Sequence, residues 1–183
     1  KTTILNIISG LIKPTSGEVL FDGARVNDRP TRERHIAQVF QFPVVYDTMS
    51  VFDNLAFPLR NRGQDEGVVR TRTGEIMELL DLSKLANAKS GGLNPAEKQI
   101  VSLGRGIART DTMAVLLDEP LTVIDPVLKL DLRRKLRLAQ QELKLTMIYV
   151  THDQHEALTF ADHVTIMKDG AVMQSDTPEA LFL

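Results

Sequence analysis

The strongest constraint on the fold is a pair of short apolar segments, each followed by side chains that can do acid–base chemistry. Residues 114–117 are apolar and lead directly into Asp118 and Glu119, and the mostly apolar residues 146–150 lie just before His152. Apolar runs of this length predict buried strands. Neighbouring parallel strands deliver the residues that follow them to one edge of a sheet. We therefore expect the two acids and the imidazole to form a hydrolytic site.

Strand patterns alternate with helical patterns along the chain, which predicts an α/β fold with a mostly parallel sheet. We expect an antiparallel β portion near the N-terminus, because Asp22-Gly23 is a hairpin signal. The patterns predict helices over 2–12, 95–109 and 127–144, a short helix that includes 157–160, and a final helix that starts over 178–182. They predict strands over 17–21, 36–40, 114–118, 146–150, 164–167 and 171–174. Residues 51–89 are predicted to be mainly helical, with interruptions at Gly63 and Gly67. This suggests a helical subdomain over about 50–110 within one domain spanning 1–183.

Composition excludes several classes of protein. The chain is 43% hydrophobic and 25% charged, which argues against disorder, and its net charge of −2 gives no general attraction to nucleic acid. It contains no cysteine, which excludes disulfides and thiol catalysis and is compatible with a reducing cytoplasm. No apolar run approaches the roughly 20 residues that a membrane-spanning helix needs.

Lys1-Thr2-Thr3 opens the first predicted helix and matches the end of the phosphate-binding pattern G-x-x-x-x-G-K-[ST]. In that pattern the lysine reaches the β- and γ-phosphates of a nucleotide, and the hydroxyl of the next residue binds Mg²⁺. The helix N-terminus also directs free N–H groups at the anion. A solvated N-terminal lysine is the alternative for so short a match. We expect the glycines of the pattern to precede Lys1, so that the sequence is a fragment.

Four further side chains complete the predicted site. Asp118 would bind Mg²⁺ through water, and Glu119 would orient and deprotonate the attacking water. His152 would contact the γ-phosphate and hold base and water in line. Gln41, at the end of a predicted strand, offers its amide oxygen to Mg²⁺ or the water. Taken singly, the acids could be caps at a strand end, and the histidine and glutamine could be structural. Their joint occurrence in this order favours the site.

Together these motifs resemble the nucleotide-binding domain of an ABC transporter. The matching segments are Lys1-Thr2-Thr3 (end of Walker A), Ser9-Gly10-Leu11, Pro14-Thr15-Ser16-Gly17, Gln41 (Q-loop), Leu117-Asp118-Glu119-Pro120 (Walker B), Leu121 to Asp125 (D-loop) and Thr151-His152-Asp153 (H-loop). The resemblance implies a P-loop NTPase fold that binds ATP and Mg²⁺ and hydrolyses ATP. It also implies a head-to-tail dimer, with ATP held between one subunit's Walker motifs and the other subunit's signature motif.

The signature motif departs from the family pattern Leu-Ser-Gly-Gly-Gln. The helix that follows it corresponds to Gln99–Arg109, and counting back places the signature at Leu93-Asn94-Pro95-Ala96-Glu97. Ser90-Gly91-Gly92, just upstream, is out of register, and we interpret it as a loop.

The local chemistry of this register favours a helix start but not an anion site. Asn94 is a favourable N-cap, Pro95 suits the first helical position, and Glu97 has the spacing of a capping box. Proline removes an N–H donor, Ala96 replaces a glycine, and Glu97 adds negative charge where the partner's ATP would lie. We therefore expect a heterodimer with a second ATPase subunit that has an intact signature. Asp125 of the D-loop would lie at the same dimer contact.

Residues 51–60, 151–162 and 168–179 resemble carbohydrate-uptake ATPases, and the degenerate signature resembles that of glycerol or glycerol-phosphate importers. This implies a peripheral subunit on the cytoplasmic face of the inner membrane, with integral membrane permeases as partners and a solute-binding protein as an indirect one. A C-terminal regulatory domain would begin where the sequence ends. The apolar residues 42–46 either dock on the permease or pack within the helical subdomain. The alternative functions are a soluble remodelling ATPase and a regulatory subunit with one weak ATP site.

Overall fold

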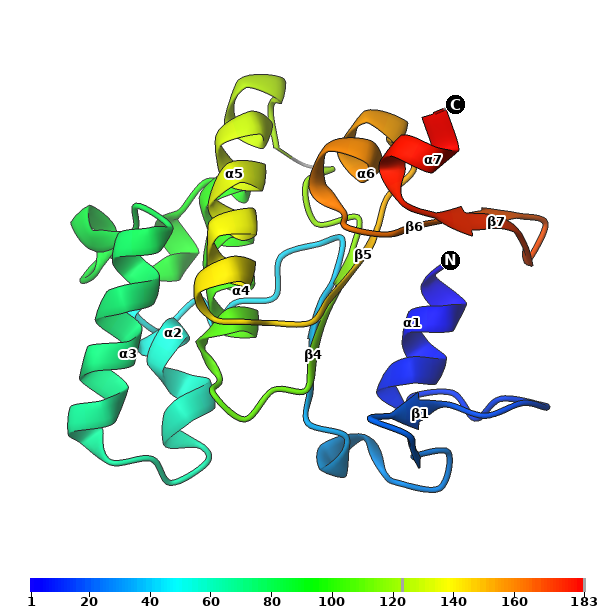
Figure 1. The fold of residues 1–183 in the computed structure, drawn as a ribbon. Helices are drawn as coiled ribbons and strands as arrows, with labels where there is room; N and C mark the ends of the chain where they lie inside the picture. Colours follow the sequence, from blue (N-terminus) through cyan, green and yellow to red (C-terminus); the bar gives the residue numbers. More distant parts are fainter. Residues whose placement is uncertain (123, 183) are drawn as a thin grey trace.

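A computed structural model describes residues 1–122 and 124–182 of the chain (Figure 1). Its helices are α1 (Thr2–Ser9), α2 (Val51–Arg60), α3 (Glu66–Leu79), α4 (Pro95–Ala108), α5 (Pro126–Glu142), α6 (Gln154–Phe160) and α7 (Pro178–Phe182). Its strands are β1 (Leu20–Phe21), β2 (Ala24–Arg25), β3 (Ile36–Val39), β4 (Ala114–Asp118), β5 (Met147–Val150), β6 (Val164–Lys168) and β7 (Ala171–Asp176). Short 3₁₀ turns cover Thr31–Glu33, Ser83–Leu85 and Ser90–Gly92.

The sheet that positions the site is parallel, with the strand order β3-β4-β5. Every residue of the central strand β4 is buried, as expected for a parallel strand covered on both faces. Strands β1 and β2 form an antiparallel hairpin, and β6 and β7 form another. The predicted α/β fold, with a parallel sheet, antiparallel N-terminal strands and a helical region, is confirmed.

Helix α4 is the central packing element on one side of the sheet, between the strands and helices α2 and α3 (Figure 1). Two of its glycines make this close packing possible. A Cβ atom on Gly104 would lie 2.5 Å from Leu55 Cδ2 of α2, and one on Gly106 would lie 2.7 Å from Val39 Cγ2 of β3. Small residues on both faces of α4 therefore let helices and sheet share one core.

A buried arginine fixes the other end of the helix that begins at Lys1. Arg34 is only 2% exposed, and its guanidinium donates to the carbonyls of Ile7 and Ile8 at 2.8 and 2.9 Å. These are carbonyls of the last turn of α1, where a cation is favoured by the helix dipole. Gly10 follows with φ +83°, and a Cβ there would lie 2.6 Å from Arg34 Nε. Helix α1 therefore ends at Ser9, not at residue 12 as predicted.

Several predicted boundaries are wrong for local reasons. Gly67 does not interrupt a helix, because it lies in the first turn of α3 and donates its N–H to the capping carboxylate of Asp65. The predicted strand over 17–21 is confined to Leu20–Phe21. By contrast, the short helix predicted to include 157–160 is present as α6, which begins at Gln154 because Asp153 caps it. The segment interpreted as a loop over 90–92 forms a 3₁₀ turn with Ser90 fully buried.

Within the described residues, none of the helices has both the length and the apolar character needed to cross a bilayer.

Candidate functional site

Strand β4 ends at the two acids that the sequence singles out. Asp118 is its last residue, pairs with Val150 of β5 and is 7% exposed. The N–H of Glu119 still donates to the Val150 carbonyl at 2.8 Å, but the backbone of Glu119 is left-handed, with φ 46°. Such a backbone costs free energy for a residue with a Cβ. The chain therefore turns sharply at Glu119, directly after the strand.

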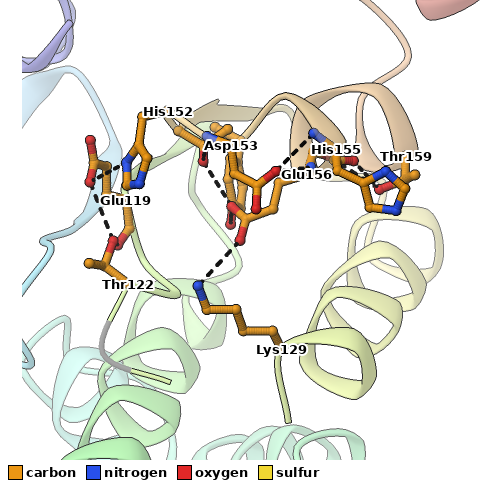
Figure 2. A network of polar contacts seen from close by, with 10 residues as sticks. Glu119, Thr122, Lys129, His152, Asp153, His155, Glu156 and Thr159 are labelled. Carbon is orange, nitrogen blue, oxygen red and sulfur yellow. Dashed lines mark hydrogen bonds and ion pairs between the residues drawn. The ribbon is translucent and has the colours of Figure 1, made fainter. Parts of the chain in front are cut away.

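The side chain of Glu119 meets that of His152, as Figure 2 shows. His152 Nδ1 lies 3.0 Å from Glu119 Oε2, and the hydroxyl of Thr122 donates to the same oxygen at 3.3 Å. The imidazole is 69% exposed, whereas the Glu119 side chain is 25% exposed. An acid and an imidazole from neighbouring strand ends thus form a hydrogen-bonded pair that remains open to a ligand. This is the geometry of a carboxylate base held by a second group.

The N-terminus of α1 lies beside this pair. Lys1 Nζ donates to the carbonyl oxygen of Thr151, the residue before His152, at 2.5 Å. Thr2 and Thr3 form the exposed first turn of α1, which has neither a side-chain cap nor an acidic residue. The first N–H groups of the helix are therefore available to an anion. The structure brings the opening lysine together with the histidine loop, as the motifs predict.

Gln41 comes to the same edge of the sheet through strand register. Val39 pairs with Leu117, so Gln41 and Glu119 each lie two residues beyond a paired position on adjacent parallel strands. Gln41 is partly exposed and follows the end of β3. Gln41 is thus placed beside Glu119 at the same edge of the sheet.

The side chains at this edge suit Mg²⁺ better than a metal that needs three or more histidine, cysteine or acidic ligands from the protein. Asp118 supplies a buried carboxylate, and Thr2 and Gln41 supply neutral oxygens. Among the described residues there is no cluster of three or more histidine, cysteine or acidic side chains that could hold a metal. Mg²⁺ usually binds through one or two carboxylates, substrate phosphates and retained water, so this sparse donor set suits it.

The predicted signature segment forms a complete capping box at the start of α4. Asn94 Oδ1 accepts the Glu97 N–H at 2.9 Å, and Glu97 Oε2 accepts the Asn94 N–H at 2.9 Å. Pro95 occupies the first helical position, while Leu93 and Ala96 pack against the main core. The Glu97 carboxylate is thus held by local backbone, at a helix start that lacks the N–H of Pro95. The structure does not bring this segment into hydrogen-bond contact with the Glu119–His152 pair.

Asp125, the last residue of the predicted D-loop, is the N-cap of α5. Its carboxylate accepts the N–H groups of Val127 and Leu128 at 2.9 and 3.2 Å. The carboxylate is exposed. Val123 of the same predicted loop lies outside the described residues. Within this chain, Asp125 therefore serves to cap helix α5.

The apolar segment 42–46 is divided between core and surface. Val45 packs against the main core, whereas Phe42 and Val44 are 69% and 50% exposed. The Tyr46 ring meets Phe57 edge to face at 4.8 Å and lies 4.5 Å from the Arg105 guanidinium. Part of this segment is therefore available as an apolar surface next to Gln41.

A cavity of about 610 Å³ lies between α1, β5 and β6, beside the site. Lys1 and Thr151 line it, together with apolar residues of β5 such as Met147 and Ile148. Glu119 and His152 do not line it. The space is thus adjacent to the Glu119–His152 pair but is not formed by it.

Three side chains that hold the loop carrying His152 were not identified from the sequence. They are those of Tyr149, Thr151 and Glu156. Glu156 is 4% exposed and accepts hydrogen bonds from the hydroxyls of Tyr149 and Thr151 at 3.0 and 2.9 Å. Its spacing from Asp153 is that of a capping box, which would place the carboxylate on the surface. Only the tertiary structure shows that the carboxylate turns inward.

Comparison with known proteins places these features in a family context. Residues 1–122 match the family model described as "ABC transporter". Over 182 residues, covering 100% of this chain, the sequence is 40% identical to the uncharacterised ABC transporter ATP-binding protein YcjV of Escherichia coli O157:H7. The same protein of E. coli O6:K15:H31 (strain 536) is also 40% identical over 182 residues.

A solved structure is similar over nearly the whole fold. This is cbiO1 from Clostridium perfringens, described as part of the ABC transporter complex cbiONQ. The TM-score is 0.89 at 26% sequence identity, and the match covers 99% of this chain and 74% of that one. The chain spans 50% of the length of the E. coli relatives.

Proposed function

This chain belongs to the ABC transporter family, and from that premise we propose that it binds and hydrolyses ATP as the energising subunit of a transporter. The observation that carries the proposal is the pairing of Glu119 with His152 at 3.0 Å, beside the Lys1 contact to Thr151. A base, an orienting imidazole and a phosphate-binding lysine at one sheet edge are the components that phosphoryl transfer to water requires.

The residues of the site would each have a specific role in ATP hydrolysis. Glu119 accepts a proton from the attacking water, and the contacts from His152 and Thr122 fix the direction of its carboxylate. Lys1 and the first N–H groups of α1 bind the β- and γ-phosphates, with Thr3 in the same exposed turn. Thr2, Gln41 and Asp118 would hold Mg²⁺. When bound, Mg²⁺ would neutralise charge on the transferred phosphoryl group.

The test is Glu119→Gln in the full-length protein, because the amide keeps the shape of the side chain but is a very weak base. We expect ATP turnover to fall by about 10²–10⁴-fold while ATP binding persists. Glu75→Gln is the matched control, because that carboxylate lies on α3, where it pairs with Arg72, outside the residues assigned to the site. Unchanged turnover in the Glu119→Gln variant would remove Glu119 as the base.

We further propose that the functional unit is a heterodimer with a second ATPase that has an intact signature. Support comes from the start of α4, where Pro95 lacks an N–H and Glu97 adds negative charge. Residues 93–97 and Asp125 would contribute to the weak composite site, and the partner's signature would complete the strong one. Single-turnover hydrolysis should be much faster for the chain with its partner than alone. Full activity from a purified homodimer would contradict this proposal.

We also propose that the transporter imports a small polyol or sugar, of the glycerol type. This proposal is supported by the resemblance of residues 51–60 and 151–162 to carbohydrate-uptake ATPases. The exposed Phe42 and Val44 would dock on integral membrane permeases from the cytoplasmic face of the inner membrane, and a solute-binding protein would act indirectly. Co-purification with a permease tests this. Co-purification with ribosomes or DNA would favour a soluble remodelling ATPase instead.

A further inference from the structure

The loop that carries His152 is attached to a buried carboxylate that the hydrolysis chemistry does not use. The Glu156 side chain is 5% exposed, and its Oε2 accepts the hydroxyls of Tyr149, on β5, and Thr151, in the loop. Lys129 of α5 lies 3.9 Å from Oε1 (Figure 2). A buried carboxylate is unfavourable unless it is well paired, and apolar residues of similar size often stabilise a core better. Because Glu156 lies beside the site, its role is more consistent with holding the site's groups in position than with stabilising the core.

The chemistry of the carboxylate gives these hydrogen bonds a fixed direction. An ionised carboxylate can only accept, so the hydroxyl of Thr151 must donate to it. The lone pairs of that hydroxyl then face the Asp153 N–H, which donates to Thr151 Oγ1 at 3.0 Å. Burial and the adjacent Glu156 carboxylate also raise the pKa of Tyr149, which keeps that hydroxyl a donor. The loop is therefore held by a one-way chain of hydrogen bonds from Asp153 through Thr151 to Glu156.

Every residue of the loop 151–153 has a fixed contact as a result. The carbonyl of Thr151 accepts from Lys1, and the ring of His152 meets Glu119. The carboxylate of Asp153 caps α6 by accepting the N–H groups of His155 and Glu156. The backbone on both sides of His152 is thus tied to the single carboxylate of Glu156.

We propose that Glu156 is a positioning residue that sets the placement of His152 against Glu119 and of the Thr151 carbonyl against Lys1. The proposal rests on the proposed ATP hydrolysis, because the positioned groups are those of that site. Glu156 has no direct contact with Glu119 or Lys1 and acts through Thr151.

The test compares Thr151→Val, Thr151→Ser and Glu156→Gln in the full-length protein. Valine removes the hydroxyl but keeps the shape, and serine restores the hydroxyl. We expect kcat for ATP to fall about tenfold in Thr151→Val. The KM should stay within about twofold, and Thr151→Ser should recover most of kcat. Glu156→Gln should lower kcat by less than Thr151→Val, because the amide oxygen of glutamine can still accept the Thr151 hydroxyl.

Thr159→Val is the matched control. Thr159 lies on α6, and its hydroxyl donates to the His155 carbonyl within that helix, away from the loop (Figure 2). This variant should keep the wild-type kcat. Wild-type kcat in both Thr151→Val and Glu156→Gln would overturn the proposal. If Glu156→Gln fails to fold, the two Thr151 variants still decide it.

Hydrogen exchange gives a second readout that does not depend on hydrolysis. The Asp153 amide should exchange at least about tenfold faster in Thr151→Val, and its protection should return in Thr151→Ser. An unaltered exchange rate would overturn the positioning role, even in a protein that turns over no ATP. Absence of ATP turnover in the wild-type protein, by contrast, would overturn the proposed function alone.

Discussion

Two glutamates of this chain, Glu119 and Glu97, make hydrogen bonds of about equal length but have different structural roles. Glu119 Oε2 lies 3.0 Å from a ring nitrogen of His152, 33 residues away in sequence. Glu97 Oε2 lies 2.9 Å from the N–H of Asn94, three residues before it. The first contact joins two strand ends and leaves an exposed imidazole, whereas the second completes a helix start. A hydrogen-bond partner that is distant in the sequence distinguishes the candidate site at Glu119 from the helix cap at Glu97, whose partner is three residues away.

The backbones of the two regions support this distinction. Glu119 is left-handed and strained, with φ 46°, while Asn94 has the extended backbone that is normal for an N-cap. We therefore expect changes at the Glu119–His152 pair to lower turnover, and loss of the cap at Asn94 to lower stability.

Removing the imidazole should have the largest effect after loss of the Glu119 carboxylate itself. We expect His152→Ala in the full-length protein to lower kcat for ATP about 100-fold, because the carboxylate of Glu119 loses the contact that orients it. His155→Ala is the control, since its ring lies on α6 and points away from Glu119 (Figure 2). Steady-state hydrolysis measures both. Equal activity in the two variants would remove His152 from the site.

Restoring the family signature should convert the cap region into an anion site. We expect the combined Asn94→Ser, Pro95→Gly, Ala96→Gly and Glu97→Gln variant to raise turnover of the purified protein about tenfold. That gain corresponds to about 1.5 kcal/mol, or one charge-assisted hydrogen bond. Ala96→Gly alone keeps the proline and the acid and serves as the control. No gain in the combined variant would contradict the weak-site interpretation.

Loss of the cap alone should reduce stability. Asn94→Ala removes the acceptor for the Glu97 N–H, and we expect a loss of about 1 kcal/mol in the free energy of unfolding. Urea denaturation with an unchanged slope measures it. Glu97→Gln should cost less, because glutamine can still accept the Asn94 N–H. A larger loss for Glu97→Gln would mean that its charge, not the capping box, stabilises the helix start.

The caps of α4 and α6 should differ slightly in their response to acid. Backbone N–H groups of Glu156 and His155 lower the pKa of Asp153 below its ordinary value of 3.8, whereas Asn94 does not titrate. A carboxyl whose pKa is lowered by folding stabilises the protein above its unfolded pKa. That stabilisation is lost as the pH falls through the folded pKa.

The acid response can be measured with one substitution. The urea midpoint of the wild type should therefore fall more than that of Asp153→Asn between about pH 5 and about pH 3. Asparagine keeps the cap but removes the charge, so the shift should be small. Parallel curves for the two proteins over this range would contradict the assignment of Asp153 as the acid-sensitive cap.

Much of the molecule could be predicted from the sequence, because it depends on neighbours along the chain. The buried strand over 114–118, the hairpin at Asp22-Gly23 and the capping box at Asn94 all follow from residue type and short spacing. The errors, such as the end of α1 at Ser9, arose where a distant side chain, Arg34, took part.

The amino-acid sequence is enough to identify the family, most of the helices and strands, and the chemical types at the strand ends. The folded structure was needed to show that Glu119 meets His152, that Lys1 meets Thr151, and that the Glu156 carboxylate turns into the interior. The physical reason is that a hydrogen bond between near neighbours is set by their spacing along the chain. Contacts between distant residues depend on the register of β4 against β5 and on the packing of α5 and α6 beside them.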